Sequence, residues 1–229
     1  SETVLDEIGE RAIEVALNYG DKDADTEVVL LTMGPQGSAS TLLRKGLAMG
    51  ATSAVHVTDE LLVGADLGLT AEVLAAAVQR TGYDLVITGN LSTDGGAGAI
   101  PAMVAEILDV PQLTALVSVN IDTGTVSGTR ATDAGTMQVS AALPAVISIT
   151  EALPDARFPN FRGIMAAKKK SFEIVTLADL SIDPDDIATA RSIMLAIAEK
   201  PPRKAGVKII DEGDAGNKLA EFLTLNRLV

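Results

Sequence analysis

Residues 157–170 (RFPNFRGIMAAKKK), which we call the basic aromatic segment, have a composition suited to binding another macromolecule. They hold five cations and no acid, and Phe158 and Phe161 are half of the four phenylalanines in the chain. Burying five unpaired cations would be very costly, so we expect the segment on the surface. Rings set among cations are typical of interface anchors. The alternative is a loop whose rings pack on the core while its lysines only face water.

Residues 89–98 (GNLSTDGGAG), which we call the glycine loop, have the composition of an anion-binding turn. Three glycines at 95, 96 and 98 would let the backbone approach a ligand closely, Ser92 and Thr93 offer hydroxyl donors, and Asp94 could cap the next helix. The loop has neither the Gly-Lys-Ser/Thr of a Walker loop nor the G-x-G-x-x-G dinucleotide spacing. Ligand binding and a merely connecting turn both remain open at this point.

The composition excludes several kinds of site and partner for this chain. The absence of cysteine excludes disulfides, thiolates and iron–sulfur ligation, and His56, the single histidine, lies in an apolar run (AVHV) that favours a satisfied strand residue over a metal ligand or a base. The net charge is −13, and residues 1–150 hold 6 Lys+Arg against 19 Asp+Glu, so nucleic-acid binding is not expected. No run of eighteen apolar residues and no secretory signal is found, which predicts a cytoplasmic protein, or a matrix protein in a eukaryote.

Periodicity predicts the elements that position these two segments. Helices are expected at 4–18, 38–49, 67–80 and 98–108, and strands at 27–33, 53–57 and 84–89. Strands that alternate with helices of this length indicate βαβ units, and therefore a mostly parallel, doubly wound α/β sheet covered on both faces.

The pattern changes after Pro111. Strands at 113–121, 125–132, 136–141 and 145–150 are separated by turn residues and predict antiparallel hairpins added to the sheet. A further helix is expected at 184–199, and a final amphipathic helix at 215–225. Since Pro201-Pro202 interrupts the chain, we expect a nucleotide-binding α/β domain at 1–200 and a C-terminal helical arm at 201–229.

Four stretches together resemble the β subunit of electron-transfer flavoprotein, in a form similar to actinobacterial sequences. They are LPAVISITEALPDARFPNFRGIMAAKKK at 143–170, LDEIGERAIEVAL at 5–17, LRKGLAMGA at 43–51 and the glycine loop. The resemblance covers nearly the whole chain and implies a fold like that of adenine-nucleotide hydrolases. In this family a leading strand and a nucleotide-contacting loop precede the segment that 4–17 resembles, so we expect this numbering to begin inside the domain.

The resemblance implies a structural AMP. In the family the glycine loop wraps the phosphate and ribose, and the segment at 3–6 and the strand end at Met33 add contacts. Thr3 and Val4 depart from the Asn-Pro common there, and no Lys or Arg lies in 89–98, so backbone amides would carry most of the phosphate recognition. The implied nucleotide residues are Thr3, Val4, Leu5, Asp6, Met33, Gly89, Asn90, Leu91, Ser92, Thr93, Asp94, Gly95, Gly96, Ala97, Gly98, Ala99 and Ile100.

The resemblance also implies an electron carrier rather than an enzyme. Its FAD would be shared with an α subunit, on which the C-terminal arm would pack. Its electron donors would be acyl-CoA or related flavoprotein dehydrogenases of β-oxidation. Its electron acceptor would be a membrane quinone oxidoreductase. Phe161 stands where the family has an apolar docking anchor, usually leucine, Arg162 replaces a usual proline, and Ala166 a frequent lysine. The implied docking residues are Arg157, Phe158, Phe161, Arg162, Ile164, Met165, Lys168, Lys169 and Lys170.

Three alternatives stay open. A bifurcating relative would hold a second FAD in place of AMP. A hydrolase of similar fold would need a nucleophile and a base, for which the sequence offers no candidate pair. A stress-type nucleotide-binding module would be stable without an α subunit.

Overall fold

The computed structural model of the chain describes residues 6–92, 95–186, 191–192, 195–196, 198–203, 206, 208 and 210–229. The chain divides into two compact units, Ser1–Ile193 and Met194–Val229, which we describe separately. The sequence predicted this boundary after residue 200.

The described strands of the first unit form two sheets. One has the order β1-β2-β8 and is wholly parallel; the other has the order β3-β7-β4-β5-β6, parallel from β3 to β4 and antiparallel from β4 to β6. The strands are β1 (Val29–Met33), β2 (Ser53–Val57), β3 (Leu85–Gly89), β4 (Gln112–Asp122), β5 (Thr125–Thr132), β6 (Gly135–Ala142), β7 (Ala145–Ile149) and β8 (Phe172–Val175). The predicted fold class, α/β with mostly parallel strands and added hairpins, is confirmed.

Strand β7 corrects one expectation. We predicted it as part of the hairpins, but it lies between β3 and β4 and runs parallel to both. All five of its residues are buried. A continuous apolar run of this kind is typical of a strand covered on both faces, whereas hairpin strands with one wet face alternate.

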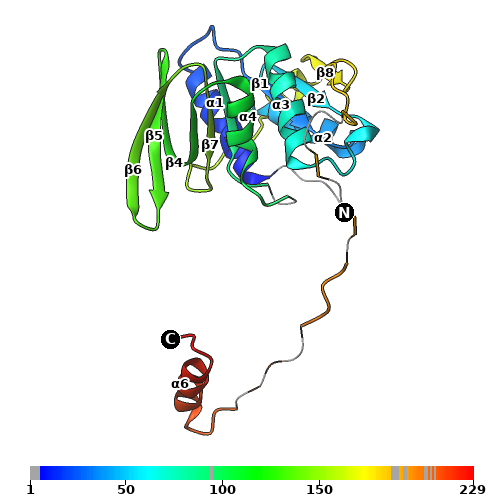
Figure 1. Cartoon of the computed structure of the whole chain (residues 1–229). Helices are drawn as coiled ribbons and strands as arrows, with labels where there is room; N and C mark the ends of the chain where they lie inside the picture. The colour runs from blue at the N-terminus through cyan, green and yellow to red at the C-terminus, as the bar shows by residue number, and fades with distance from the viewer. Residues whose placement is uncertain are drawn as a thin grey trace. The chain divides into compact units, whose positions relative to one another are not determined.

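Helices cover both faces of the parallel strands, whereas the hairpin of β5 and β6 projects beyond them and β6 is mostly exposed (Figure 1). Alternate residues of β1 face opposite layers, because Leu30 packs with α1 and α2 while Leu31 packs beneath α3. Helix α5 joins the first layer through buried Ala167, and α4 lies beside α3 in the second. The helices are α1 (Glu7–Gly20), α2 (Gln36–Met49), α3 (Leu67–Thr81), α4 (Ile100–Leu108) and α5 (Phe161–Ala167), with a short 3₁₀ turn η1 (Glu60–Leu62).

Helix α1 is shared between the two sheets. Leu17 belongs to the core cluster that holds Leu30 and Leu47, while Ala12 belongs to the cluster of Leu113 and Ile147. One amphipathic helix therefore covers strands of both sheets, which explains its apolar residues on more than one stripe.

The segment expected as a helix at 184–199 is not helical in the residues that are described there. Instead, Arg191 forms an ion pair with Glu72 of α3 (2.7 Å), and the Ser192 amide donates to the Asp66 carboxylate at the start of α3 (2.6 Å). These two residues therefore make tertiary contacts with α3 where local propensity favoured a helix. Strand β8 had no prediction at all.

The second unit contains α6 (Ala215–Leu225), with the bounds that the sequence predicted. Among the described residues of the whole chain, we find no helix whose length and apolar character would let it cross a bilayer.

Arg157 joins the start of the basic aromatic segment to α1. Its guanidinium donates to both carboxylate oxygens of Glu14, at 2.8 and 3.0 Å, and its backbone amide donates to Glu14 as well, at 3.0 Å. Asp21 receives a further bond of 2.8 Å. From α1, Arg11 reaches back to the Leu153 carbonyl, at 2.6 Å. The loop between β7 and α5 is thus fixed on α1 from both sides.

The Arg157–Glu14 pair shifts both titrations. Burial raises the pKa of the Glu14 carboxyl, but the hydrogen bonds and the charge of Arg157 outweigh it, so this pKa lies below its ordinary value of 4.5. The hydrogen bond to Glu14, followed by that to Asp21, raises the pKa of Arg157. Because folding lowers the Glu14 pKa, the pair stabilises the fold above pH 4.5 and loses this contribution as the pH falls through the lowered value.

We predict that Arg157→Met lowers the free energy of unfolding by about 2 kcal/mol at pH 7, because the buried Glu14 carboxylate loses its cation. The loss is smaller than for a fully buried pair, since the Arg157 side chain is 31% exposed. Urea unfolding at several pH values measures it, and the difference from the unmodified chain should shrink below pH 4.5. Arg162→Met, the same change at an exposed position of the same segment, should stay within about 0.5 kcal/mol. Equal stability of Arg157→Met and the unmodified chain at pH 7 would contradict the assignment.

Candidate functional site

The glycine loop leaves the carboxyl end of β3 and turns into α4. The Asn90 amide donates to the Ile149 carbonyl at the end of β7 (2.9 Å), so the loop starts at a fixed point. Gly96 and Gly98 have φ values of 63° and 64°, in the left-handed region that favours glycine. A Cβ at Gly98 would lie 3.4 Å from the Asn90 carbonyl oxygen, which is already a tight contact. Thr93 and Asp94 lie outside the described residues.

Two polar features of this loop suit a bound ligand. The cap residue before α4 is Ala99, whose side chain offers no acceptor to the amides of the first turn, and Pro101 lies in that turn. A helix start of this kind favours an anion. The side-chain oxygen of Asn90 is buried and has no hydrogen-bond partner, although buried polar atoms normally have one. The loop therefore combines an open helix start with an acceptor that a ligand N–H or O–H could satisfy.

The structure brings only some of the expected nucleotide residues together. The first turn of α1 lies against the end of β3, because a Cβ at Gly89 would be 3.2 Å from the Ile8 side chain. Asp6 takes the cap position of α1 without a side-chain cap bond. Met33 ends β1 in the other sheet and packs on the cluster beneath α3. Thr3, Val4 and Leu5 lie outside the described residues.

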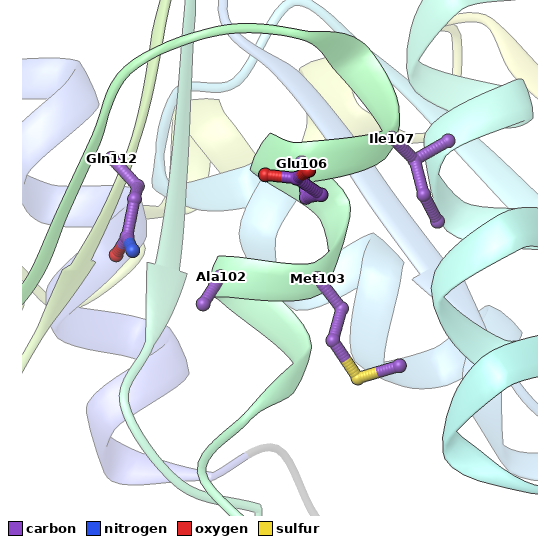
Figure 2. Close-up of a pocket in the computed structure, with 5 residues that line it drawn as sticks. All are labelled: Ala102, Met103, Glu106, Ile107 and Gln112. Carbon is purple, nitrogen blue, oxygen red and sulfur yellow. The ribbon is translucent and has the colours of Figure 1, made fainter.

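A separate surface pocket of about 400 Å³ lies beside α4 and the start of β4 (Figure 2). Its lining is Ala102, Met103, Glu106, Ile107 and Gln112. The charged group among these is a carboxylate, which would repel a phosphate. This pocket therefore suits an apolar contact better than the nucleotide.

His56 has the structural role that its sequence context favoured. It is buried in β2, and Nε2 lies 2.9 Å from the Gly34 carbonyl oxygen. In the part of the chain that the structure describes, no group of three or more His, Cys, Asp or Glu side chains could hold a metal ion.

The rings of the basic aromatic segment do not pack on the core. Phe158 is 93% exposed and Phe161 78%, and Ile164 and Met165 are each about half exposed. The alternative in which the rings fold back is therefore wrong. Exposed apolar groups of this size normally mark an interaction surface.

The backbone beneath these rings is held firmly on α2. The Asn160 side chain caps α5 by accepting from the Gly163 amide (2.8 Å), and a Cβ at Gly163 would lie only 2.2 Å from the Ala48 carbonyl oxygen. The Lys170 ammonium donates to the carbonyls of Leu47, Gly50 and Ala51 at 2.5–3.2 Å, and burial lowers its pKa. A cation is favourable at this end of a helix.

The five cations of the segment thus fall into two groups. Arg157 and Lys170 have intramolecular partners on α1 and α2, whereas Arg162, Lys168 and Lys169 are exposed. The sequence grouped all five as docking residues. It also gave no sign of Glu14 as the partner of Arg157, because the two residues are 143 positions apart.

The chain is similar over its whole length to known proteins. The family model described as "Electron transfer flavoprotein domain" matches residues 1–180. The chain is 44% identical to the electron transfer flavoprotein subunit beta of Mycobacterium tuberculosis (strain ATCC 25618 / H37Rv) over 236 residues, covering 100% of this chain and 88% of the relative.

The corresponding subunit of Mycobacterium leprae (strain TN) is 43% identical, with 100% of this chain and 88% of the relative covered. That of Bacillus subtilis (strain 168) is 28% identical, with 99% of this chain and 87% of the relative covered. With a family match over more than half of the chain and near-complete coverage at this identity, the chain belongs to the electron transfer flavoprotein β-subunit family.

Proposed function

We propose that this β subunit holds AMP at the glycine loop, helps to seat the FAD domain of an α subunit, and docks flavoprotein dehydrogenases through the basic aromatic segment. The observation that carries the docking part is the exposure of Phe158 and Phe161 on a backbone that is fixed to α1 and α2. When bound, FAD supplies the reversible electron transfer from acyl-CoA or related dehydrogenases to a membrane quinone oxidoreductase. The chain acts as a carrier subunit and not as an enzyme.

The backbone of the glycine loop is the main reason for proposing AMP as its ligand. Gly96 and Gly98 turn the chain in a conformation open to glycine, and the start of α4 offers amides toward an anion. The buried Asn90 oxygen is an acceptor that matches a ribose hydroxyl or an adenine amino group. These residues would hold the nucleotide without a cation, since residues 89–98 contain none.

The basic aromatic segment supports brief docking. A carrier that serves several donors must dissociate quickly, so a small contact with one ring as anchor suits it better than a broad interface. The exposed cations Arg162, Lys168 and Lys169 would raise the association rate toward an acidic partner.

The exposed apolar residues of α6 are evidence for an α subunit as the permanent partner of the second unit. Its apolar side chains Leu219, Phe222 and Leu225 are 53%, 46% and 82% exposed. Such residues on an 11-residue helix need an apolar surface to cover them.

The central test is the composition of the co-expressed subunits. Purified alone, the chain should be nearly colourless, and with its α subunit it should retain one FAD and one AMP per heterodimer. A visible spectrum and chromatography of the released nucleotides measure both. Two FAD per heterodimer would support the bifurcating alternative, and turnover of a nucleotide would support a hydrolase. Stoichiometric FAD on the isolated chain, or the failure of the chain to assemble with an α subunit, would contradict the proposal.

Gly96→Val should reduce the AMP retained by the heterodimer and lower its melting temperature. A β-branched residue is strained at a φ of 63°, and the loop must move away from the ligand to relieve it. Gly37→Val in α2 serves as control, because Gly37 is exposed, has no positive φ and has nothing within 4 Å of an added Cβ. Unaltered AMP content in Gly96→Val would mean that the loop is only a connector.

Phe161→Ala should raise the KM of a cognate dehydrogenase for the heterodimer about thirtyfold, the effect of losing about 2 kcal/mol at a buried anchor. The flavin spectrum, AMP content and assembly should stay unchanged. Leu61→Ala, at an exposed leucine outside the segment, is the control. Replacing Lys168 and Lys169 with Gln should lower the transfer rate at low salt and matter less at high salt. Unchanged transfer by Phe161→Ala at sub-saturating concentration would refute the docking role of the ring.

A further inference from the structure

A second surface pocket, of about 530 Å³, lies where α5 crosses α2, directly beside the exposed rings. Buried Ala48 of α2 and Ala167 of α5 line it together with Pro159 and Ile164. This volume lies in the range of sites that enclose ligands, so it accommodates a large apolar side chain. Because Gly163 packs on the Ala48 carbonyl and Lys170 binds the last carbonyls of α2, the pocket is already formed in the free chain.

The rim of this pocket is cationic in a chain that is otherwise acidic. Residues 1–150 contain 6 Lys+Arg, and two of them, Arg44 and Lys45, line this pocket together with Lys168. Arg44 donates to the Ala167 carbonyl (2.6 Å) and lies 5.1 Å from the Phe172 ring centre, two contacts that leave its charge uncompensated. Lys45 pairs with Glu10, whose side chain is 22% exposed, so Arg44 and Lys168 carry most of the positive charge at the rim.

We propose that this pocket receives an apolar side chain, flanked by carboxylates, from the flavoprotein dehydrogenase that docks on the basic aromatic segment. The inference rests on the proposed docking function and extends it, since the contact becomes reciprocal. Phe161 enters the partner, and the partner enters the pocket between α2 and α5. Charge complementarity selects an acidic segment, and Ile164, which is half exposed and also lines the pocket, makes the two surfaces continuous.

The reciprocal contact explains how a small interface can be specific. A single exposed ring would fit many apolar grooves, whereas a ring and a charged-rim pocket at a fixed spacing demand two matching features at once. The fixed spacing follows from the backbone contacts of α5, because Asn160 and Lys170 bind at its two ends.

The test uses the assembled heterodimer and an acyl-CoA dehydrogenase of the same organism that reduces it. Thr41 is exposed on α2 and lines the pocket, so Thr41→Trp fills the pocket with little demand on the fold. We expect the KM of the dehydrogenase for the Thr41→Trp heterodimer to rise about tenfold or more, while kcat and the FAD and AMP content stay unchanged. Thr41→Glu should raise KM at low salt and recover at high salt, whereas the effect of Thr41→Trp should persist. Thr41→Ser, which leaves the pocket open, should transfer electrons like the unmodified protein.

The outcomes separate this inference from the docking proposal. If Phe161→Ala raises KM and neither Thr41→Trp nor Thr41→Glu does, the pocket inference is wrong and docking on the ring stands. If Thr41→Trp raises KM and Phe161→Ala does not, the pocket is supported and the ring is not the anchor. If Thr41→Trp blocks assembly with the α subunit, or changes the number of copies by light scattering, the occupant is the α subunit or a second copy, and the inference is overturned.

Discussion

The Glu14 carboxylate is buried on α1, and it stays ionised because Arg157 supplies three hydrogen bonds and a charge to it. A carboxylate in this position without its cation would be costly, so the pair fixes where the chain can run after β7. Every feature of the basic aromatic segment follows from that position. Asn160, three residues after this clamp, caps α5, and the helix reaches α2 at Gly163, where only a residue without a Cβ fits against the Ala48 carbonyl.

The most exposed rings of the chain therefore belong to one of its most firmly held loops. Phe158 and Phe161 face water, yet the residues on both sides of them bind α1 and α2 through Arg157 and Lys170. A loop that is already ordered loses less conformational entropy when it binds, so a small contact can be specific and still brief. The same internal bonds remove two of the five cations from the proposed docking surface and leave Arg162, Lys168 and Lys169.

Strand β7 lies between the glycine loop and the basic aromatic segment, the two regions for which we propose a function. Its last residue, Ile149, accepts the Asn90 amide at the start of the glycine loop, and the chain that follows it runs directly to Arg157. Helix α1 covers strands of both sheets, so its position is common to the glycine loop and the Arg157 clamp.

The sequence by itself determined the elements whose signals are local. The bounds of α6 and the strand at Ser53–Val57 were predicted to the residue, and the exposure of the basic aromatic segment followed from the cost of burying its charge. Tertiary structure decided the rest. Strand β7 is parallel because it pairs with β3 and β4, and residues 191–192 are bound by Glu72 and Asp66 and are not helical. The partners of Arg157 and Lys170 lie more than 110 residues away, and the pocket at Ala48 and Ala167 joins two helices that are distant in the chain. Charge and periodicity predict which residues face water, but which cation binds a carboxylate or a helix end depends on tertiary packing.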